Sequence, residues 1–385
     1  MSDPHEAPLP LALPEPLRAE AEAVCEGILA YLLRCREARP GEYYGAFWSE
    51  KAYHGPLLNY HGGGSHHHRT AGSAGLGLWL AGAARSEPTL QRAAELAFDW
   101  LAARQRPRGG YQEIQNNEKP SDWEYTGLEE LSTIETGFVC HGLGQALLHG
   151  LAPKKAYMDT LQRAAHWQLS LEWPAGSGVF PHHERSPYNT LNANLHAAET
   201  LAVAYAALRQ VYGLTLNLFL EGARRAVART LPCQWANGCL PYREGAGVTI
   251  NYTSLVLWCL LNLLEALPEG SRRVILGVGN VPQALGAACG FLRECVDGEG
   301  RLLWEEYETS TAKYNLWTYL ITANVLQRQG GAENEAAAAR LLRHAFGRRT
   351  PAGLLPMRDR GEEITECAFM QADMLLFLLP LTARC

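Results

Sequence analysis

The sequence predicts an all-α protein, an (α/α)6 toroid of six helical hairpins with long loops on one rim. Three observations predict it. Six amphipathic helical segments recur along the 385 residues, six less charged helical segments alternate with them, and a glycine-led turn follows most of the amphipathic ones. Hydrophobic residues make up 47% of the chain and charged residues 19%, which is enough apolar material for one large core.

The amphipathic segments place apolar residues at helical spacing, as in LQRAAELAFDWLAARQ (90–105). Such a stripe buries one face of a helix and leaves the other in water. We therefore expect these segments to form an outer layer. They cover 16–37, 89–105, 157–172, 216–232, 281–296 and 333–347.

The alternating segments are apolar almost all round, as in SLVLWCLLNLLEAL (254–267) and CAFMQADMLLFLLPL (367–381). A helix of this kind must be covered on several sides, so we expect an inner ring. An open solenoid is the alternative, and near-complete burial of all six segments favours the closed ring. They cover 70–84, 135–149, 192–211, 253–267, 314–329 and 365–381.

The repeated turn gives the period of the array. Its glycines recur about every 53–69 positions, the length of a helical hairpin plus a loop, and RPGEYYGAFWSE (39–50) is a diverged first copy. Loops that enter the inner segments are long, and long loops are uncommon unless they are functional. We therefore expect one toroid domain over 1–385, with 1–15 as an extension and the site on the rim. The other copies are GGYQEI (109–114), GVFPHHE (178–184), GCLPYRE (238–244), GRLLWEE (300–306) and GLLPMRD (353–359).

Composition limits the partners. A formal charge of -6 provides no basic field for nucleic acid, and no apolar stretch reaches the roughly 18 residues of a membrane helix. The N-terminus has no basic region typical of a signal peptide, so we expect a cytoplasmic protein. Most of the ten cysteines lie in apolar helical runs and are expected to be core residues. The oligomeric state is left open.

The first two long loops carry candidate site residues. Twelve of the 13 histidines precede residue 200, and several of them gather in the first loop beside three glycines. Polar residues at a pocket rim are common in binding sites. The candidates for catalytic contact in this loop are His61, His66, His67, His68 and Arg69. In the second loop, aromatic and acidic residues alternate, which suits a saccharide, and we expect Trp123 and Glu124 to bind substrate.

The third loop, GVFPHHERSPYNTLNANLHAAET (178–200), is the densest. Asn192 and His196 are one helical turn apart and share a face at the start of an inner helix. The catalytic candidates here are His182, His183, Glu184, Tyr188, Asn192 and His196. Elsewhere, Tyr beside Asn recurs where inner helices begin, for which helix N-capping by Asn is the alternative explanation. The further substrate-binding candidates are His141, Asn251, Tyr252, Trp304, Tyr314 and Asn315.

This repeat resembles, over nearly the whole chain, the six-hairpin toroid superfamily of carbohydrate-active enzymes, which also includes terpene and lanthionine cyclases. NANLHAAETLAVAYAAL (192–208) looks like a helix of the N-acylglucosamine and cellobiose 2-epimerases, with their H-x-x-E step at His196 and Glu199. That family has further catalytic histidines in later hairpins. This chain has no histidine between His196 and His344.

Cys140-His141-Gly142 is similar to the CHG motif of lanthionine cyclases, in which Cys and His bind zinc beside a second Cys. That second Cys belongs to a W-C-Y-G motif upstream, whereas Trp258-Cys259 lies downstream and lacks Tyr-Gly. A catalytic zinc requires three protein ligands. We therefore expect no cofactor and no metal, with zinc bound through Cys140 and His141 as the alternative.

The candidate residues favour a carbohydrate lyase or epimerase. Removing a proton from an acidic, uronate-type saccharide needs a His or Tyr base and Asn, Arg or His donors that stabilise the enolate. The expected partner is a small-molecule or oligosaccharide substrate. One alternative is a glycoside hydrolase with two carboxylates, drawn from Glu113, Asp122, Glu124, Glu184 and Glu305. The others are a terpene- or lanthionine-type cyclase acting on a natural-product precursor, and a toroid that binds a ligand without catalysis.

Overall fold

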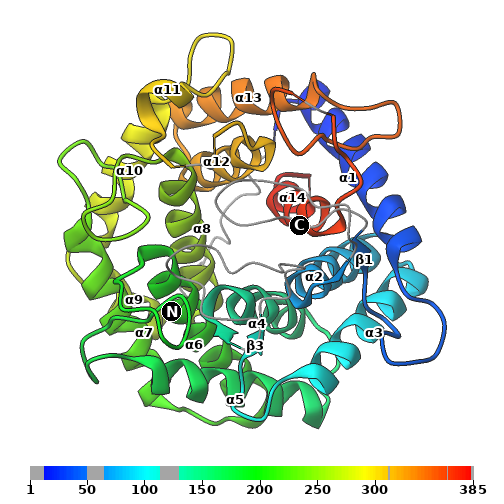
Figure 1. Ribbon diagram of the computed structural model, residues 1–385, viewed down its shortest axis with the longest axis vertical. Helices are drawn as coiled ribbons and strands as arrows, with labels where there is room; N and C mark the ends of the chain where they lie inside the picture. The colour runs from blue at the N-terminus through cyan, green and yellow to red at the C-terminus, as the bar shows by residue number, and fades with distance from the viewer. Residues whose placement is uncertain (1–12, 50–64, 113–129, 311–312, 362, 383–385) are drawn as a thin grey trace, which may run out of the picture.

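A closed inner ring of six helices confirms the predicted toroid. The computed structural model describes residues 13–49, 65–112, 130–310, 313–361 and 363–382. Each inner helix packs against the next, and the last packs against the first (Figure 1), so the array is not an open solenoid. The inner helices are α2 (His68–Arg85), α4 (Thr133–Leu148), α6 (Leu191–Tyr212), α8 (Ile250–Ala266), α12 (Leu316–Gln329) and α14 (Ala368–Thr382).

Six amphipathic helices form the outer layer, with bounds within a few residues of those predicted. They are α1 (Glu15–Cys35), α3 (Pro88–Arg104), α5 (Lys155–Leu171), α7 (Asn217–Thr230), α10 (Val281–Glu294) and α13 (Ala332–Phe346). Three short elements are additional: the 3-10 turn η1 (Leu231–Cys233), α9 (Glu269–Leu276) and α11 (Trp304–Tyr307). Helix α9 lies in the connection from inner α8 to outer α10, which the sequence pattern does not mark as helical.

Two small antiparallel ladders stand at the bases of the first two long loops. Strand β1 (Trp48–Ser49) pairs with β2 (Ser65–His66), and β3 (Tyr111–Gln112) pairs with β4 (Leu131–Ser132). Each ladder directly precedes an inner helix, α2 or α4. The ladders therefore fix where the chain enters the ring.

The repeated glycines are docking points between hairpins. Gly109 has a φ of +107°, and a Cβ added to it would lie 2.4 Å from the carbonyl oxygen of Arg163 in α5. Only glycine combines this backbone conformation with so close an approach. Five other turn glycines, all with positive φ, meet a backbone carbonyl of α3, α7, α10, α13 or α1 in the same way: Gly45, Gly178, Gly238, Gly300 and Gly353. The contact of Gly353 with α1 joins the last hairpin to the first.

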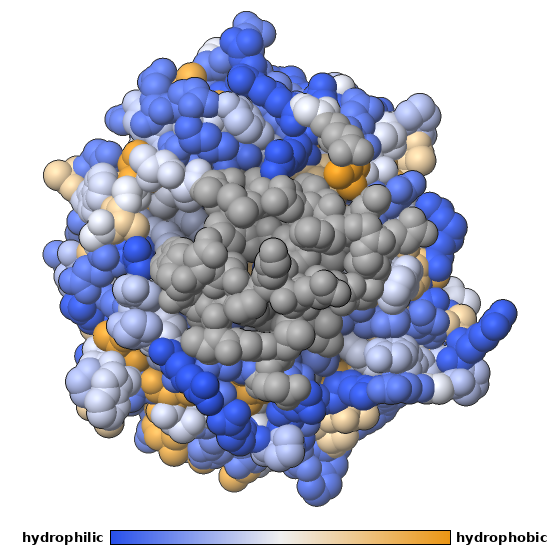
Figure 2. Space-filling view, in the orientation of Figure 1, coloured by the Kyte–Doolittle hydropathy of each residue, from blue (hydrophilic) through white to orange (hydrophobic). Residues whose placement is uncertain are grey.

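The apolar residues are concentrated in one core between the two helical layers. On the face shown in Figure 2, hydrophilic residues predominate around the described periphery and hydrophobic ones are scattered. Among the described residues, no single helix is long and apolar enough to cross a membrane, and one bent pair, α9 with α10, passes that test by length and composition.

Candidate functional site

Four buried side chains capable of proton or metal chemistry gather where α4, α6 and α8 adjoin. His141 comes from α4, His196 and Glu199 from α6, and Cys259 from α8. We call these four residues the α4–α6–α8 cluster. His196 and Glu199 are the sixth and ninth residues of α6, so at 1.5 Å per residue they lie about 6–11 Å along the helix from Asn192. The cluster is thus set back from the ends at which the long loops enter.

His141 and Glu199 form a close pair. The Nδ1 atom of His141 is 2.5 Å from Oε1 of Glu199, and both side chains are buried. Asn262 Nδ2 lies 3.5 Å from the same nitrogen, and the ring of Trp258 packs 4.7 Å from the imidazole, centroid to centroid. A buried carboxylate needs such a partner, and the pair holds a proton between an imidazole and a carboxylate.

His196 is enclosed on three sides. A Cβ added to Gly137 of α4 would lie 2.8 Å from its Cβ and Nδ1, the Phe138 ring lies 4.9 Å away, and Cys259 Sγ is 3.5 Å from Nδ1 and 3.7 Å from Nε2. Burial, and then the nearby charges of Arg69, His141 and His182, hold the pKa of His196 well below its usual range. The imidazole is therefore neutral, with a lone pair on one ring nitrogen.

Cys259 and Glu199 face each other. Burial, then the negative charge of Glu199 and a hydrogen bond to it, raises the pKa of the Cys259 thiol well above its usual range. Among the described residues, no N–H or O–H group donates to the second oxygen of Glu199, Oε2, although that oxygen is fully buried. The carboxylate thus has one oxygen bound to His141 and one without such a donor.

A buried ion pair lies beside the cluster. The guanidinium of Arg69 binds Asp373 of α14 and stacks 3.5 Å above the Phe138 ring. Asp373 also accepts a 2.9 Å hydrogen bond from the Ser73 hydroxyl, and the backbone N–H of Arg69 donates to Glu135 at 2.7 Å. Burial raises the pKa of Asp373, although Arg69 and Ser73 act in the opposite direction. Arg69 thus ties α2, α4 and α14 together.

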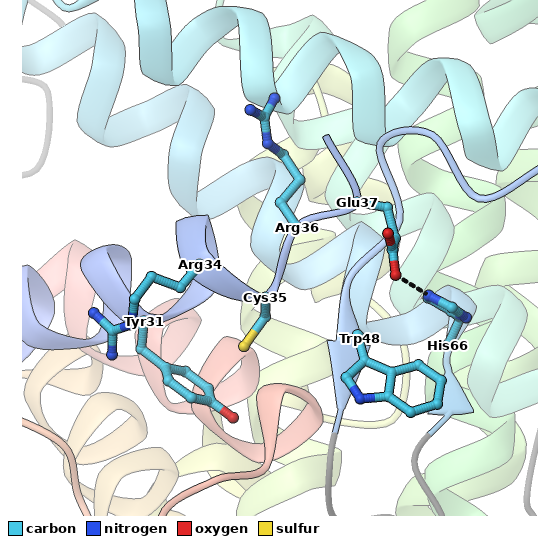
Figure 3. A pocket seen from close by; sticks show the side chains of 7 residues that line it. All are labelled: Tyr31, Arg34, Cys35, Arg36, Glu37, Trp48 and His66. Carbon is cyan, nitrogen blue, oxygen red and sulfur yellow. Dashed lines mark hydrogen bonds and ion pairs between the residues drawn. The ribbon is translucent and has the colours of Figure 1, made fainter. Parts of the chain in front are cut away.

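The first-loop histidines that the structure describes do not lie together. His66 lines a peripheral pocket of about 550 Å³, where its Nε2 contacts Glu37 at 3.1 Å (Figure 3). Its ring also stacks on that of Tyr43. His67 is buried, with its ring 5.4 Å from that of Phe369. The remaining residues of the pocket are Tyr31, Arg34, Cys35, Arg36 and Trp48.

His68 faces the outer layer. Its ring stacks on Trp100 of α3 and packs on Tyr111, and Nδ1 donates to the carbonyl of Gln112 at 3.2 Å. Burial, and then the charges of Arg104 and Arg106, lowers the pKa of His68 to about 4. In this position the side chain joins α2 to α3 and strand β3.

Most of the third-loop candidates lie apart from the cluster. His182 and His183 stack at 4.2 Å, and burial lowers the pKa of His183 to about 2. Glu184 forms an ion pair with Arg108 at 2.7 Å. The ring of Tyr188 lies 4.4 Å from the guanidinium carbon of Arg243. Of this group, only His196 belongs to the α4–α6–α8 cluster.

The asparagines predicted at inner-helix starts are buried but do not cap the helices. Asn192 is the second residue of α6, and Asn251 Oδ1 accepts from Thr318 at 2.9 Å. Asn315 occupies the N-cap position of α12 without a side-chain capping bond. Among the described residues, no hydrogen bond reaches Oδ1 of Asn192 or Asn315.

The remaining aromatic candidates lie among other side chains. The ring of Tyr252 packs 4.4 Å from that of Tyr242. Tyr314 donates to Glu305, which also pairs with Lys313, and Trp304 packs 5.8 Å from the Tyr314 ring. The other predicted positions lie outside the described residues, and their roles stay predictions: His61, Trp123, Glu124, Glu113 and Asp122.

The predicted zinc alternative involves a different cysteine from the one in the cluster. Cys140 is buried, and burial followed by the charge of Glu199 raises its pKa. In the described part of the chain, the one group of His, Cys, Asp or Glu residues whose ligand atoms could surround a metal is His196, Glu199 and Cys259. His141 is adjacent to that group through Glu199.

Sequence reasoning did not propose Glu135, Asp373 or Cys259 for the site. A signal was present for the two acids, because each is an ionisable residue inside an otherwise apolar helix, and such a residue is buried only with a partner. For Cys259 the signal was the Trp258-Cys259 pair compared with the W-C-Y-G motif, which was set aside because a cysteine in an apolar run is ordinarily a core residue.

Comparison with solved structures shows the fold. A cellobiose 2-epimerase from Spirochaeta thermophila superposes with a TM-score of 0.67 at 12% identity, covering 95% of this chain and 97% of that one. An unsaturated glucuronyl hydrolase specific for heparin superposes with a TM-score of 0.61 at 10% identity, covering 95% of this chain and 96% of that one. A type II terpene cyclase from Scytonema superposes with a TM-score of 0.60 at 13% identity, covering 96% of this chain and 99% of that one. No family model and no curated protein sequence matches the chain. The shared architecture is the six-hairpin toroid, which different chemistries use.

Proposed function

We propose that this protein is a carbohydrate-active enzyme, an epimerase or isomerase that removes a proton from a sugar carbon next to a carbonyl and returns it. One observation carries the proposal: the α4–α6–α8 cluster places a neutral imidazole, His196, beside the His141–Glu199 pair. A neutral imidazole accepts a proton, and a His–carboxylate pair takes up or supplies another. Because a fold does not choose a reaction, the argument rests on these side chains.

The surroundings of the cluster suit a sugar. The buried rings of Phe138 and Trp258, 5.7 Å apart, form the apolar side of the cluster, and aromatic rings are the groups on which the apolar faces of sugars stack. Arg69 offers N–H donors beside Phe138, and Asn192 has a free buried acceptor. Hydrogen bonds from such donors stabilise negative charge on an oxygen as it develops.

The proposed step needs no redox partner. His196 takes the proton from the carbon next to the carbonyl, the C–H electrons form a carbon–carbon double bond, and the carbonyl oxygen takes the charge of an enediolate. Return of a proton to the opposite face of that carbon gives the epimer. If the proton instead goes to the former carbonyl carbon, and the hydroxyl on the carbon that lost its proton is deprotonated to become the new carbonyl, the product is the isomer.

The local charges favour a neutral sugar. Glu135, Glu199 and Asp373 lie around the cluster, and the guanidinium of Arg69 is already paired with Asp373. A substrate carboxylate would therefore meet more negative than positive charge. Uronate saccharides are the second substrate class, because the N-termini of the inner helices, with their positive dipole ends, converge where the long loops enter.

The test is a screen in D2O. Purified protein is incubated with neutral reducing mono- and disaccharides and with uronate oligosaccharides, and proton NMR follows the hydrogen next to the carbonyl. We expect deuterium at that carbon, together with the epimer or isomer, for at least one neutral sugar. A uronate lyase would instead form an unsaturated product that absorbs ultraviolet light.

The matched variants are His196→Gln in the cluster and His166→Gln on the exposed face of α5. Loss of a general base slows turnover about 10²–10⁴-fold, which is the result expected for His196→Gln alone. Solvent exchange that survives His196→Gln at the wild-type rate would remove His196 from the mechanism. Absence of deuterium in every sugar would contradict the proposal.

A further inference from the structure

Three residues of the α4–α6–α8 cluster present nitrogen, oxygen and sulfur donors to one point. One ligand atom each from His196, Glu199 and Cys259 lies within 4.8 Å of the others, and all three side chains are buried. His196 and Glu199 are one helical turn apart on the same face of α6, and Cys259 faces them from α8. Two packed helices therefore hold the donors, and no long loop has to move to assemble them.

The sulfur and nitrogen donors are as close as two ligands of one metal. With Zn–S about 2.3 Å and Zn–N about 2.0 Å, tetrahedral geometry separates the sulfur and nitrogen ligands by about 3.6 Å. Cys259 Sγ lies 3.5 Å from Nδ1 and 3.7 Å from Nε2 of His196, so it is nearly equidistant from the two nitrogens, and sharing a metal with either also requires the imidazole to change its orientation.

Glu199 supplies a further observation. Its Oε1 is bound to His141, while its buried Oε2 receives no N–H or O–H donor from the described residues. The Cys259 thiol hydrogen-bonds to Glu199, and a cation that replaced the thiol proton and bound both groups would keep the buried carboxylate satisfied. A metal-ligating carboxylate is commonly held by an outer hydrogen bond, which is the position of His141.

We propose that His196, Glu199 and Cys259 bind one divalent cation of the zinc class, with His141 holding Glu199 in place. A thiolate, an imidazole and a carboxylate select zinc or a similar transition metal over Mg²⁺ and Ca²⁺, which prefer oxygen ligands. Three protein ligands leave a fourth position for water or a substrate oxygen. The inference does not rest on the proposed function: with the metal bound, the lone pair of His196 is occupied and the residue cannot act as the base, so the metal would inhibit the proposed proton transfer.

The test uses Co²⁺ as a spectroscopic probe for the full chain after treatment with chelator. We expect one Co²⁺ per chain, with visible bands of a tetrahedral ion and a near-ultraviolet thiolate-to-cobalt charge-transfer band. One equivalent of Zn²⁺ should abolish both, and Mg²⁺ should not. Failure of the wild-type protein to develop the charge-transfer band would overturn the proposal.

Two cysteine variants of the same kind identify the ligand. Cys259→Ser should lose the charge-transfer band, whereas Cys140→Ser, which changes the buried cysteine beside His141, should keep it. The opposite pattern would place the metal on Cys140 and refute the site proposed here. His141→Asn should keep the band and bind Co²⁺ about 10–100-fold more weakly, as expected for an outer partner. Circular dichroism of each variant checks that the fold is retained, and the readouts need no substrate.

Discussion

Replacing Gly137 with alanine tests the close approach that positions His196. The added Cβ would lie 2.8 Å from Cβ and Nδ1 of His196 and 3.0 Å from its Cγ. These atoms are not the far end of a flexible chain, and Phe138 and Cys259 enclose the ring from other directions. The imidazole cannot yield without moving α6 away from α4.

The expected magnitude follows from two opposing terms. Alanine in place of glycine inside a helix favours folding by about 1 kcal/mol, and overpacking a tight interior costs about 1–3 kcal/mol. Gly286 provides the matched control, because it is in the second turn of α10 with no atom within 4 Å of an added Cβ. The helix-propensity gain is common to both variants. The free energy of unfolding of Gly137→Ala should therefore fall about 1–3 kcal/mol below that of Gly286→Ala.

The assay is urea unfolding followed by tryptophan fluorescence and by circular dichroism, with coincidence of the two transitions as the check for two-state behaviour. Gly286→Ala should unfold at a higher urea concentration than wild type. If Gly137→Ala is stabilised as much as Gly286→Ala, α4 and α6 are not in the contact described, and the geometry of the cluster must be revised.

Two further predictions concern the buried charges. Asp373→Asn leaves Arg69 without its anionic partner and should lower the free energy of unfolding by about 3–5 kcal/mol. Glu26→Gln breaks the exposed pair with Arg85 and should lower it by less than about 1 kcal/mol in the same urea assay. Equal effects of the two substitutions would refute a buried Arg69–Asp373 pair. Because burial lowers the pKa of His68 to about 4, the unfolded chain binds the extra proton between pH 6.5 and 4 and the folded one does not. Stability should therefore fall with falling pH in that window, by about 1.4 kcal/mol per pH unit from this residue, and His68→Gln should flatten the slope while His166→Gln leaves it unchanged.

The hairpins could be predicted because their signals are local. Apolar spacing marks α3 or α7, continuous apolar runs mark α8 and α14, and positive-φ turns select glycine at a fixed period. Helix α9 escaped prediction because eight residues with a narrow buried stripe do not stand out from a polar connection. Its existence depends on packing against α7, α8 and α10, which no local pattern records.

The α4–α6–α8 cluster could be predicted only in part, because its residues come from helices that are far apart in the sequence and meet only in the folded ring. The single turn between Asn192 and His196 was visible in the sequence, and the H-x-x-E resemblance pointed to Glu199. Nothing local says that α8 turns Cys259 toward His196, or that α14 brings Asp373 to Arg69, 304 positions along the chain. His68 shows the converse, since it neighbours Arg69 in the sequence but begins α2 on the side that faces α3.

Residues that recur in every hairpin serve the stability of the ring, whereas the residues of the α4–α6–α8 cluster do not recur. The turn glycines occupy equivalent positions in all six hairpins and make the same backbone contact, from Gly45 on α3 round to Gly353 on α1. A position that recurs six times serves the ring, because ring closure needs every interface to be alike. His141, Glu199 and Cys259 have no such equivalents and lie inside helices whose apolar packing alone would favour aliphatic residues. Stability does not require them there, since replacing a buried polar group with a well-packed apolar one is often neutral or favourable, so their chemistry is what the arrangement supplies.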